Sequence, residues 1–165
     1  MSKVDLTTRR IVKTISFPEG SKPYMLRVAP DGKVVWVQSA GANSNVVLDA
    51  ATMEIQHTEP TGQGPVQSAF DPPSSRYGLV THLDETFVLV LERETGREAD
   101  RIEVGAPQAN PSITPDGAVA YVTIPSRSEV VAIDMRELAV VGSISAGTEP
   151  MGVVVFDPEA VLPTD

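Results

Sequence analysis

The 165-residue sequence predicts an all-β protein that is built from repeated four-stranded antiparallel units. The main observation is that three separate markers recur at intervals of 42 to 44 residues, a spacing typical of repeat architectures. The first marker is a proline that follows an apolar run, the second is an acid that ends an apolar run, and the third is a proline that precedes each unit. They fall at Pro30, Pro72, Pro115 and Pro158, at Asp5, Asp49, Glu92 and Asp134, and at Pro23, Pro65, Pro107 and Pro150.

Four short apolar stretches separated by turn signals occur within each period, and each stretch is expected to form a strand. Three complete units are predicted, at approximately residues 24–61, 66–104 and 110–145. The chain also opens with a third and a fourth strand at residues 4–17, and it closes with a first strand and a stub of a second at residues 151–162. The expected strands of the complete units are residues 24–28, 34–39, 46–49 and 55–61, then 66–70, 77–82, 87–92 and 99–104, then 111–113, 119–123, 130–134 and 140–145. Helical periodicity is absent, so residues 1–165 are predicted to form a single domain.

Each marker suits the turn that its position requires. In Pro30-Asp31-Gly32, the proline and the glycine favour a tight turn between the first two strands. The acid that ends a third strand, such as Asp49 or Glu92, can accept hydrogen bonds from the amides of the next turn. The second strands, such as residues 34–37 and 118–122, carry consecutive apolar residues, which suits a sheet buried on both faces. Sheets stacked face to face around an axis provide that burial, so the sequence predicts the blades of a β-propeller.

The segment Ala120-Tyr121-Val122-Thr123, which follows Pro115-Asp116-Gly117 and precedes residues 130–134, resembles the YVTN family of propeller repeats. The resemblance covers nearly the whole chain and departs at Pro72, where Pro-Pro-Ser-Ser-Arg stands in place of Pro-Asp-Gly. Propellers related to this family include surface-layer proteins, lactonase-like enzymes and domains of quinone- or haem-dependent periplasmic oxidoreductases. The resemblance therefore implies the fold, and a shared fold does not define an activity.

About half a ring is expected per chain, with three full blades and complementary partial blades at the two termini. Most propellers that resemble this one have seven or eight blades, so the blades of one chain are not expected to close a ring. We hypothesise that two chains meet head to tail in a homodimeric ring of about eight blades. Alternatively, the chain is a fragment of a larger propeller. An open arc would leave apolar blade faces and strand edges exposed, which favours association.

The formal charge of −9 disfavours nucleic acids and anionic membranes as partners, because phosphate binding requires a basic surface. The chain has no cysteine, and no apolar run approaches the roughly 20 residues of a membrane span. Residues 1–5 include an acid and polar residues ahead of any apolar stretch, so they do not resemble a secretion signal. A cytoplasmic location is expected for the chain as written, and a periplasmic or extracellular one if a leader has been removed.

Ligands of such rings usually bind at the mouth of the central channel, which is formed by the loops between blades and by the loops between second and third strands. The ligand-binding candidates near these loops are polar or aromatic, namely Tyr24, Asn43, Asn45, Gln67, Asn110 and Arg127. Loop residues of these types more often satisfy local hydrogen bonds than bind a ligand. Trp36 and Tyr121 hold corresponding places in their strands and are expected to pack between blades.

His82 and Asp84 are weak catalytic candidates, because a neighbouring carboxylate could raise the pKa of His82 and orient it as a base. No serine lies at a recognisable motif spacing, and the other histidine, His57, is expected on an outer strand at the surface. Two histidines and scattered acids do not supply the three or four convergent ligands of a metal site, so no metal site is predicted, and no cofactor is expected. The favoured function is a non-catalytic binding or scaffold module for an unknown small molecule or protein. The alternatives are a lactonase-like hydrolase or lyase and a fragment of a periplasmic redox enzyme.

Overall fold

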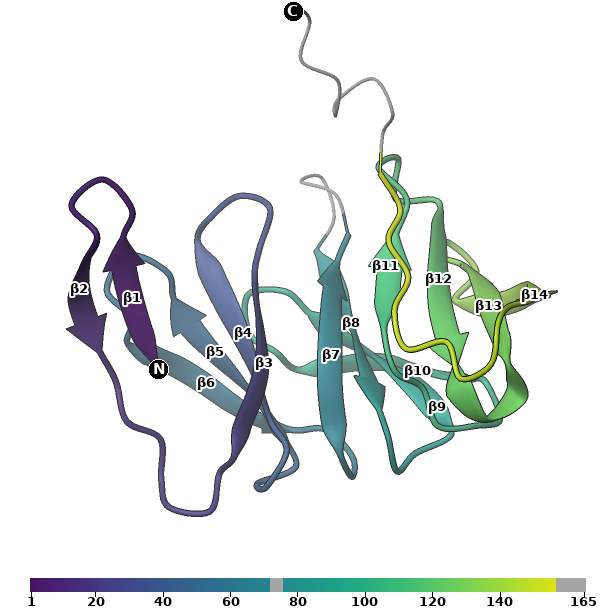
Figure 1. The fold of residues 1–165 in the computed structure, drawn as a ribbon, viewed down its shortest axis with the longest axis horizontal. Coiled ribbons are helices and arrows are strands. Elements are labelled where there is room, and N and C mark those ends of the chain that lie inside the picture. Colours follow the sequence, from purple (N-terminus) through teal and green to yellow (C-terminus); the bar gives the residue numbers. More distant parts are fainter. Residues whose placement is uncertain (72–75, 157–165) are drawn as a thin grey trace, which may run out of the picture.

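The computed structural model describes residues 1–71 and 76–156, which fold into antiparallel β-sheets (Figure 1). The markers Pro72 and Pro158 and the end of the predicted stub, residues 157–162, lie outside the described residues. Within the described ranges the only helical element is a 3-10 turn, Pro125–Arg127. No helix there is both long and apolar enough to cross a membrane.

Three of the sheets have four strands each, and in each of them consecutive strands are hydrogen-bonded neighbours. Blade 1 contains β3 (Pro23–Val28), β4 (Val34–Ser39), β5 (Ser44–Asp49) and β6 (Ile55–Pro60), blade 2 contains β7 (Pro65–Phe70), β8 (Tyr77–His82), β9 (Phe87–Glu92) and β10 (Glu98–Glu103), and blade 3 contains β11 (Pro111–Ile113), β12 (Val119–Ile124), β13 (Glu129–Asp134) and β14 (Ala139–Ser145). A two-stranded partial blade, β1 (Ser2–Asp5) and β2 (Arg10–Thr14), precedes blade 1. The predicted all-β fold of four-stranded antiparallel blades, amounting to part of a propeller, is confirmed.

The blades stand side by side, with their first strands β3, β7 and β11 in one row (Figure 1). Strand β7 contacts both β3 and β11, whereas the fourth strands lie at the other edge of each blade. Every residue of β14 is exposed, and β6 and β10 are mostly exposed. The row of first strands is therefore the inner wall of a partial propeller, and the fourth strands form its outer rim.

Apolar side chains fill the junctions between neighbouring blades. Trp36 of blade 1 is fully buried and packs with Val80 and Leu89 of blade 2. Its ring centroid lies 4.6 Å from that of Phe70, and its Nε1 donates a hydrogen bond of 2.8 Å to the carbonyl of Arg93. The prediction that Trp36 packs between blades is confirmed.

Gly78 makes room for this tryptophan. It occupies the position in blade 2 that Val35 and Ala120 occupy in blades 1 and 3, as the pairing of first and second strands shows. A Cβ atom on Gly78 would lie 2.8 Å from two atoms of the Trp36 ring and 3.0 Å from the carbonyl oxygen of Ala69. The glycine is therefore required by the close approach of a side chain from the next blade.

Replacing Gly78 by alanine is expected to lower the free energy of unfolding by about 1 to 3 kcal/mol, because the added methyl overpacks a buried junction. Chemical denaturation followed by far-UV circular dichroism measures the effect. Gly142→Ala is the matched control, since it also lies in a strand and a Cβ there meets nothing within 4 Å. An equal loss in both variants would contradict the packing explanation.

The acids that end the third strands bind the following turns in two ways. The Asp49 carboxylate accepts hydrogen bonds from two backbone amides, at 2.9 and 2.7 Å, and Asp134 does the same at 2.8 and 2.9 Å. These backbone hydrogen bonds hold the pKa values of both carboxyls below their usual range. Glu92 has a longer side chain, and its carboxylate instead accepts hydrogen bonds from the Thr95 hydroxyl at 3.0 Å and from Arg76 at 2.9 Å. The expected turn contact is thus confirmed for the two aspartates and replaced by side-chain contacts for Glu92.

The expectation of a first strand at residues 151–156 is not met, because this segment has no strand assignment. It runs beside β11 (Figure 1), and the amide of Val155 donates a hydrogen bond of 3.0 Å to the Ser112 hydroxyl. A strand requires a backbone ladder with a neighbour, and none of the described residues pairs with this segment in that way. Residues 151–156 therefore follow the path of an inner strand without forming one.

Candidate functional site

The loops between blades and the loops between second and third strands meet at one end of the inner wall. The amide of Leu83 donates a hydrogen bond of 2.9 Å to the carbonyl of Gly64, and the amide of Gln108 donates one of 2.9 Å to the carbonyl of His82. The loop after β8 is therefore joined both to the segment that enters blade 2 and to the segment that enters blade 3. This end is the mouth predicted from the order of the strands.

A cavity of about 140 Å³ lies at the mouth, and it is called the mouth cavity below. It brings together three of the predicted ligand-binding residues, Tyr24, Gln67 and Asn110, one from each of the three blades or the segment entering it. Met25 and Met151 line it as well. Tyr24 is 66% exposed, so most of its ring faces solvent at the rim. The mouth cavity offers amide groups and apolar surface, and none of the described residues that line it is acidic or basic.

The polar residues of the mouth cavity are connected across blades. With its amide oriented to satisfy both ends, Asn110 accepts a hydrogen bond of 3.1 Å from Gln67 Nε2 and donates one of 2.9 Å to the carbonyl of Val153. The carbonyl oxygen of the Gln67 side chain has no hydrogen-bond partner among the described residues.

The structure places the other binding candidates outside the mouth cavity. Asn43 is exposed in a loop, and its side-chain oxygen accepts a hydrogen bond of 3.1 Å from the amide of Gly64. Asn45 is buried in β5, where its side-chain oxygen accepts a hydrogen bond of 3.1 Å from Gln38. Arg127 donates to the carbonyls of Val104 and Gly105 and pairs with Glu129 at 3.5 Å. All three contacts join loops or strands to one another.

His82 is fully buried at the end of β8, with its ring centroid 5.4 Å from that of Phe87. Burial lowers the pKa of His82 to about 4, and the opposing attraction of Glu85 is too weak to reverse this. The expectation that a nearby carboxylate raises this pKa is therefore wrong, since desolvation dominates. Asp84 is exposed, next to Gly64. Neither residue lines the mouth cavity.

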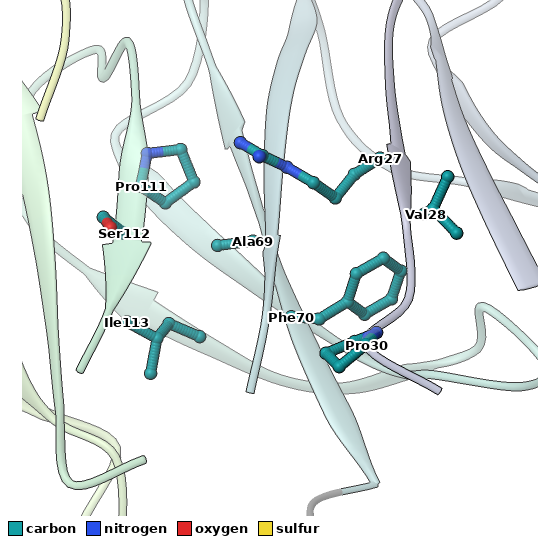
Figure 2. Close-up of a pocket in the computed structure, with 8 residues that line it drawn as sticks. All are labelled: Arg27, Val28, Pro30, Ala69, Phe70, Pro111, Ser112 and Ile113. Carbon is teal, nitrogen blue, oxygen red and sulfur yellow. The ribbon is translucent and has the colours of Figure 1, made fainter. Parts of the chain in front are cut away.

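A second cavity, of about 170 Å³, lies along the inner wall between β3, β7 and β11, and it is called the wall cavity below (Figure 2). Its lining combines one cation with mostly apolar residues, chiefly Arg27, Pro30, Phe70, Pro111 and Ile113, and it also includes Ser112. The Arg27 side chain extends from β3 toward β7 and Pro111 (Figure 2), and its Nε donates a hydrogen bond of 3.3 Å to the carbonyl of Ser68. The wall cavity is thus formed by the first strands of all three blades.

Arg27 was not among the residues predicted from the sequence, although a signal was present. It is the only charged residue in the segments predicted as first strands, residues 24–28, 66–70, 111–113 and 151–156. The candidates predicted from the sequence lie near loops, whereas this signal is a charge inside an apolar inner strand. No group of three or more His, Cys, Asp or Glu in residues 1–71 and 76–156 is placed to hold a metal ion.

No protein-family model and no curated protein matches the sequence. Solved structures do match. Hydrazine synthase from Kuenenia stuttgartiensis is 23% identical, with a TM-score of 0.73 over 84% of this chain and 40% of that one. A protein of unknown function from Desulfotomaculum acetoxidans DSM 771 is 16% identical, with a TM-score of 0.74 over 90% of this chain and 50% of that one.

A third similar structure is dihydro-heme d1 dehydrogenase NirN in complex with DHE, which is 16% identical with a TM-score of 0.73. The match covers 90% of this chain and 33% of that one. Hydrazine synthase and NirN are β-propeller proteins, so the likeness shows the propeller fold. The chain spans between a third and a half of the length of these three neighbours.

Proposed function

We propose that the chain is a non-catalytic propeller module of the YVTN-repeat type, which self-associates to complete a ring of about eight blades and binds a partner at the channel mouth. The observation that carries this proposal is an apolar cavity of about 350 Å³ beside the partial blade. Its walls come from β1 and from blade 1, and they include Met1, Leu26, Val28, Val35, Leu48 and Met53. The partial blade has two strands where the other blades have four, and the cavity lies where first and second strands would pack.

The opposite end of the arc also supports self-association. Tyr121 occupies in blade 3 the place that Trp36 occupies in blade 1, and no described blade covers it. Val130 and Ile144 pair across β13 and β14 on this same face, and Ile144 is 59% exposed. The partial blade and the exposed face are complementary. A second chain would place its own β1 and β2 beside this face, and residues 151–156 of the first chain would lie in the inner position of the same blade.

The hydrolase or lyase alternative finds no support at His82. The side chain is fully buried, and its two ring nitrogens have no hydrogen-bond partner among the described residues. A general base must come within hydrogen-bond distance of the substrate proton that it removes. A binding role at the mouth needs no such group.

Light scattering coupled to size-exclusion chromatography tests the self-association directly. We expect a particle of twice the chain mass of 17.6 kDa at micromolar concentration. Ile144→Lys is expected to convert the dimer to a monomer, because a lysine on the apolar face would bury a charge at the new junction. Ser143→Lys is the matched control, since Ser143 aligns with Val131 and so faces the opposite side of the sheet.

A wild-type protein that is monomeric and whose circular dichroism shows a folded β-protein would contradict the ring proposal. An equal loss of dimer in both lysine variants would show instead that the blade 3 face is not the contact surface.

A further inference from the structure

We infer that the wall cavity binds a small carboxylate with a short apolar tail, and that the Arg27 guanidinium is its anchor. The inference goes beyond the proposed function, because the wall cavity is separate from the mouth, where that function places the partner. It does not depend on ring closure, because every described residue of the wall cavity belongs to the same chain.

The charge at Arg27 is the first reason. Arg76, Arg93 and Arg101 each lie 3.2 Å or less from a carboxylate oxygen. Arg27 is exposed and forms no ion pair among the described residues, as is also true of Arg9, Arg10 and Arg97, but it lines the wall cavity. Its Nε is held by the Ser68 carbonyl, and its two terminal nitrogens have no partner in residues 1–71 and 76–156. In a chain of charge −9, a guanidinium with both ends of its fork free is a site for an external anion.

The second reason is the open space in front of the guanidinium. The Ser112 hydroxyl faces the other side of β11, where its oxygen accepts the hydrogen bond from the amide of Val155 (Figure 2). Ser112 occupies in blade 3 the position that Arg27 occupies in blade 1 and Ala69 in blade 2. The small Ala69 side chain on β7 leaves open the space between Arg27 and Pro111 (Figure 2).

The lining also limits the kind of anion. Among residues 1–71 and 76–156, Arg27 is the only charged residue that lines the wall cavity, so one negative charge is balanced and a second would stay uncompensated. Pro30, Phe70 and Ile113 offer an apolar surface to the rest of the ligand. These features favour a monocarboxylate with an apolar portion over phosphate or sulfate.

Benzoate is a suitable probe, and benzamide is its uncharged analogue of nearly the same shape. Isothermal titration calorimetry is expected to show saturable benzoate binding, with benzamide and inorganic phosphate each bound at least about tenfold more weakly. Arg27→Gln is expected to lower benzoate affinity about 10- to 100-fold. Arg10→Gln removes the same charge from the exposed strand β2 and is expected to bind benzoate as the wild type does.

Absence of saturable benzoate binding would overturn the inference, and so would equal binding of benzamide or unchanged binding by Arg27→Gln. Arg27 would then only tie β3 to β7 through the Ser68 carbonyl. Circular dichroism and light scattering of the same Arg27→Gln sample show whether the fold and the dimer persist. A dimer that binds no benzoate would overturn this inference alone, whereas a monomer would contradict the ring.

Discussion

Replacement of Trp36 by alanine is expected to lower the free energy of unfolding by about 3 to 5 kcal/mol. The loss has two sources, the apolar burial of the indole between blades 1 and 2 and the hydrogen bond from its Nε1 to the Arg93 carbonyl. The backbone of blade 2 cannot easily move into the space, because β7, β8 and β9 are held in one ladder. This change therefore leaves a cavity at a junction between blades.

Far-UV circular dichroism under increasing denaturant measures the effect, since the variant lacks the only tryptophan of the chain. Wild type and variants must be compared at one protein concentration, because association contributes to apparent stability. Tyr24→Ala removes an aromatic side chain that is 66% exposed and is the control, with an expected change within about 0.5 kcal/mol. A loss below about 1 kcal/mol for Trp36→Ala would contradict the assigned role of this junction.

Acid is expected to destabilise the protein through His82, by about 2 to 3 kcal/mol between pH 6.5 and about pH 4.5. Above pH 6.5 the imidazole is neutral in both the folded and the unfolded chain, so it makes no pH-dependent contribution. As the pH falls below 6.5, the unfolded chain binds a proton and the folded chain does not, because burial lowers the pKa of His82 to about 4. The free energy of unfolding therefore decreases as the pH falls, and this decrease levels off once the pH reaches the pKa of His82 in the folded chain.

The difference in unfolding free energy between about pH 7 and about pH 4.5 should shrink in His82→Gln, which has no titrating ring. His82→Ser offers a second variant, because Ser39 holds the equivalent buried position in blade 1. His57→Gln removes the other histidine, from the outer strand β6, and is expected to keep the wild-type loss. Backbone hydrogen bonds hold the pKa values of Asp49 and Asp134 below the usual aspartate range, so protonation of these carboxyls destabilises the protein only at lower pH. An identical acid response in wild type and both His82 variants would disprove the assignment.

The architecture was predictable from the sequence because each repeated marker meets a local requirement. A tight turn requires a sequence such as Pro30-Asp31-Gly32, and the turn after a third strand uses the carboxylate of Asp49 or Asp134. Such requirements recur with the structural period, so they show as a period in the sequence. The mouth could be placed for the same reason, and it contains Tyr24, Gln67 and Asn110.

The remaining features depend on contacts between residues distant in sequence. The burial of His82 comes from the fold and outweighs Glu85 three positions away, so its pKa direction could not be obtained from neighbours in the chain. The need for glycine at position 78 arises from Trp36 in another blade. Arg27 is the exception, since its lone charge in a predicted inner strand is visible in the sequence itself.

The three apolar clusters each belong to a different boundary between adjacent sheets, and no side chain is shared by all of them. Cooperativity must therefore spread along a linear series of units, as in solenoid proteins, instead of through one common centre. Once the two chains of the ring have separated, we expect gentle denaturation to detach the flanking units first and the middle boundary to persist longest. The indole of Trp36 sits at that middle boundary, so its fluorescence would report the final step of disassembly while other probes record earlier ones.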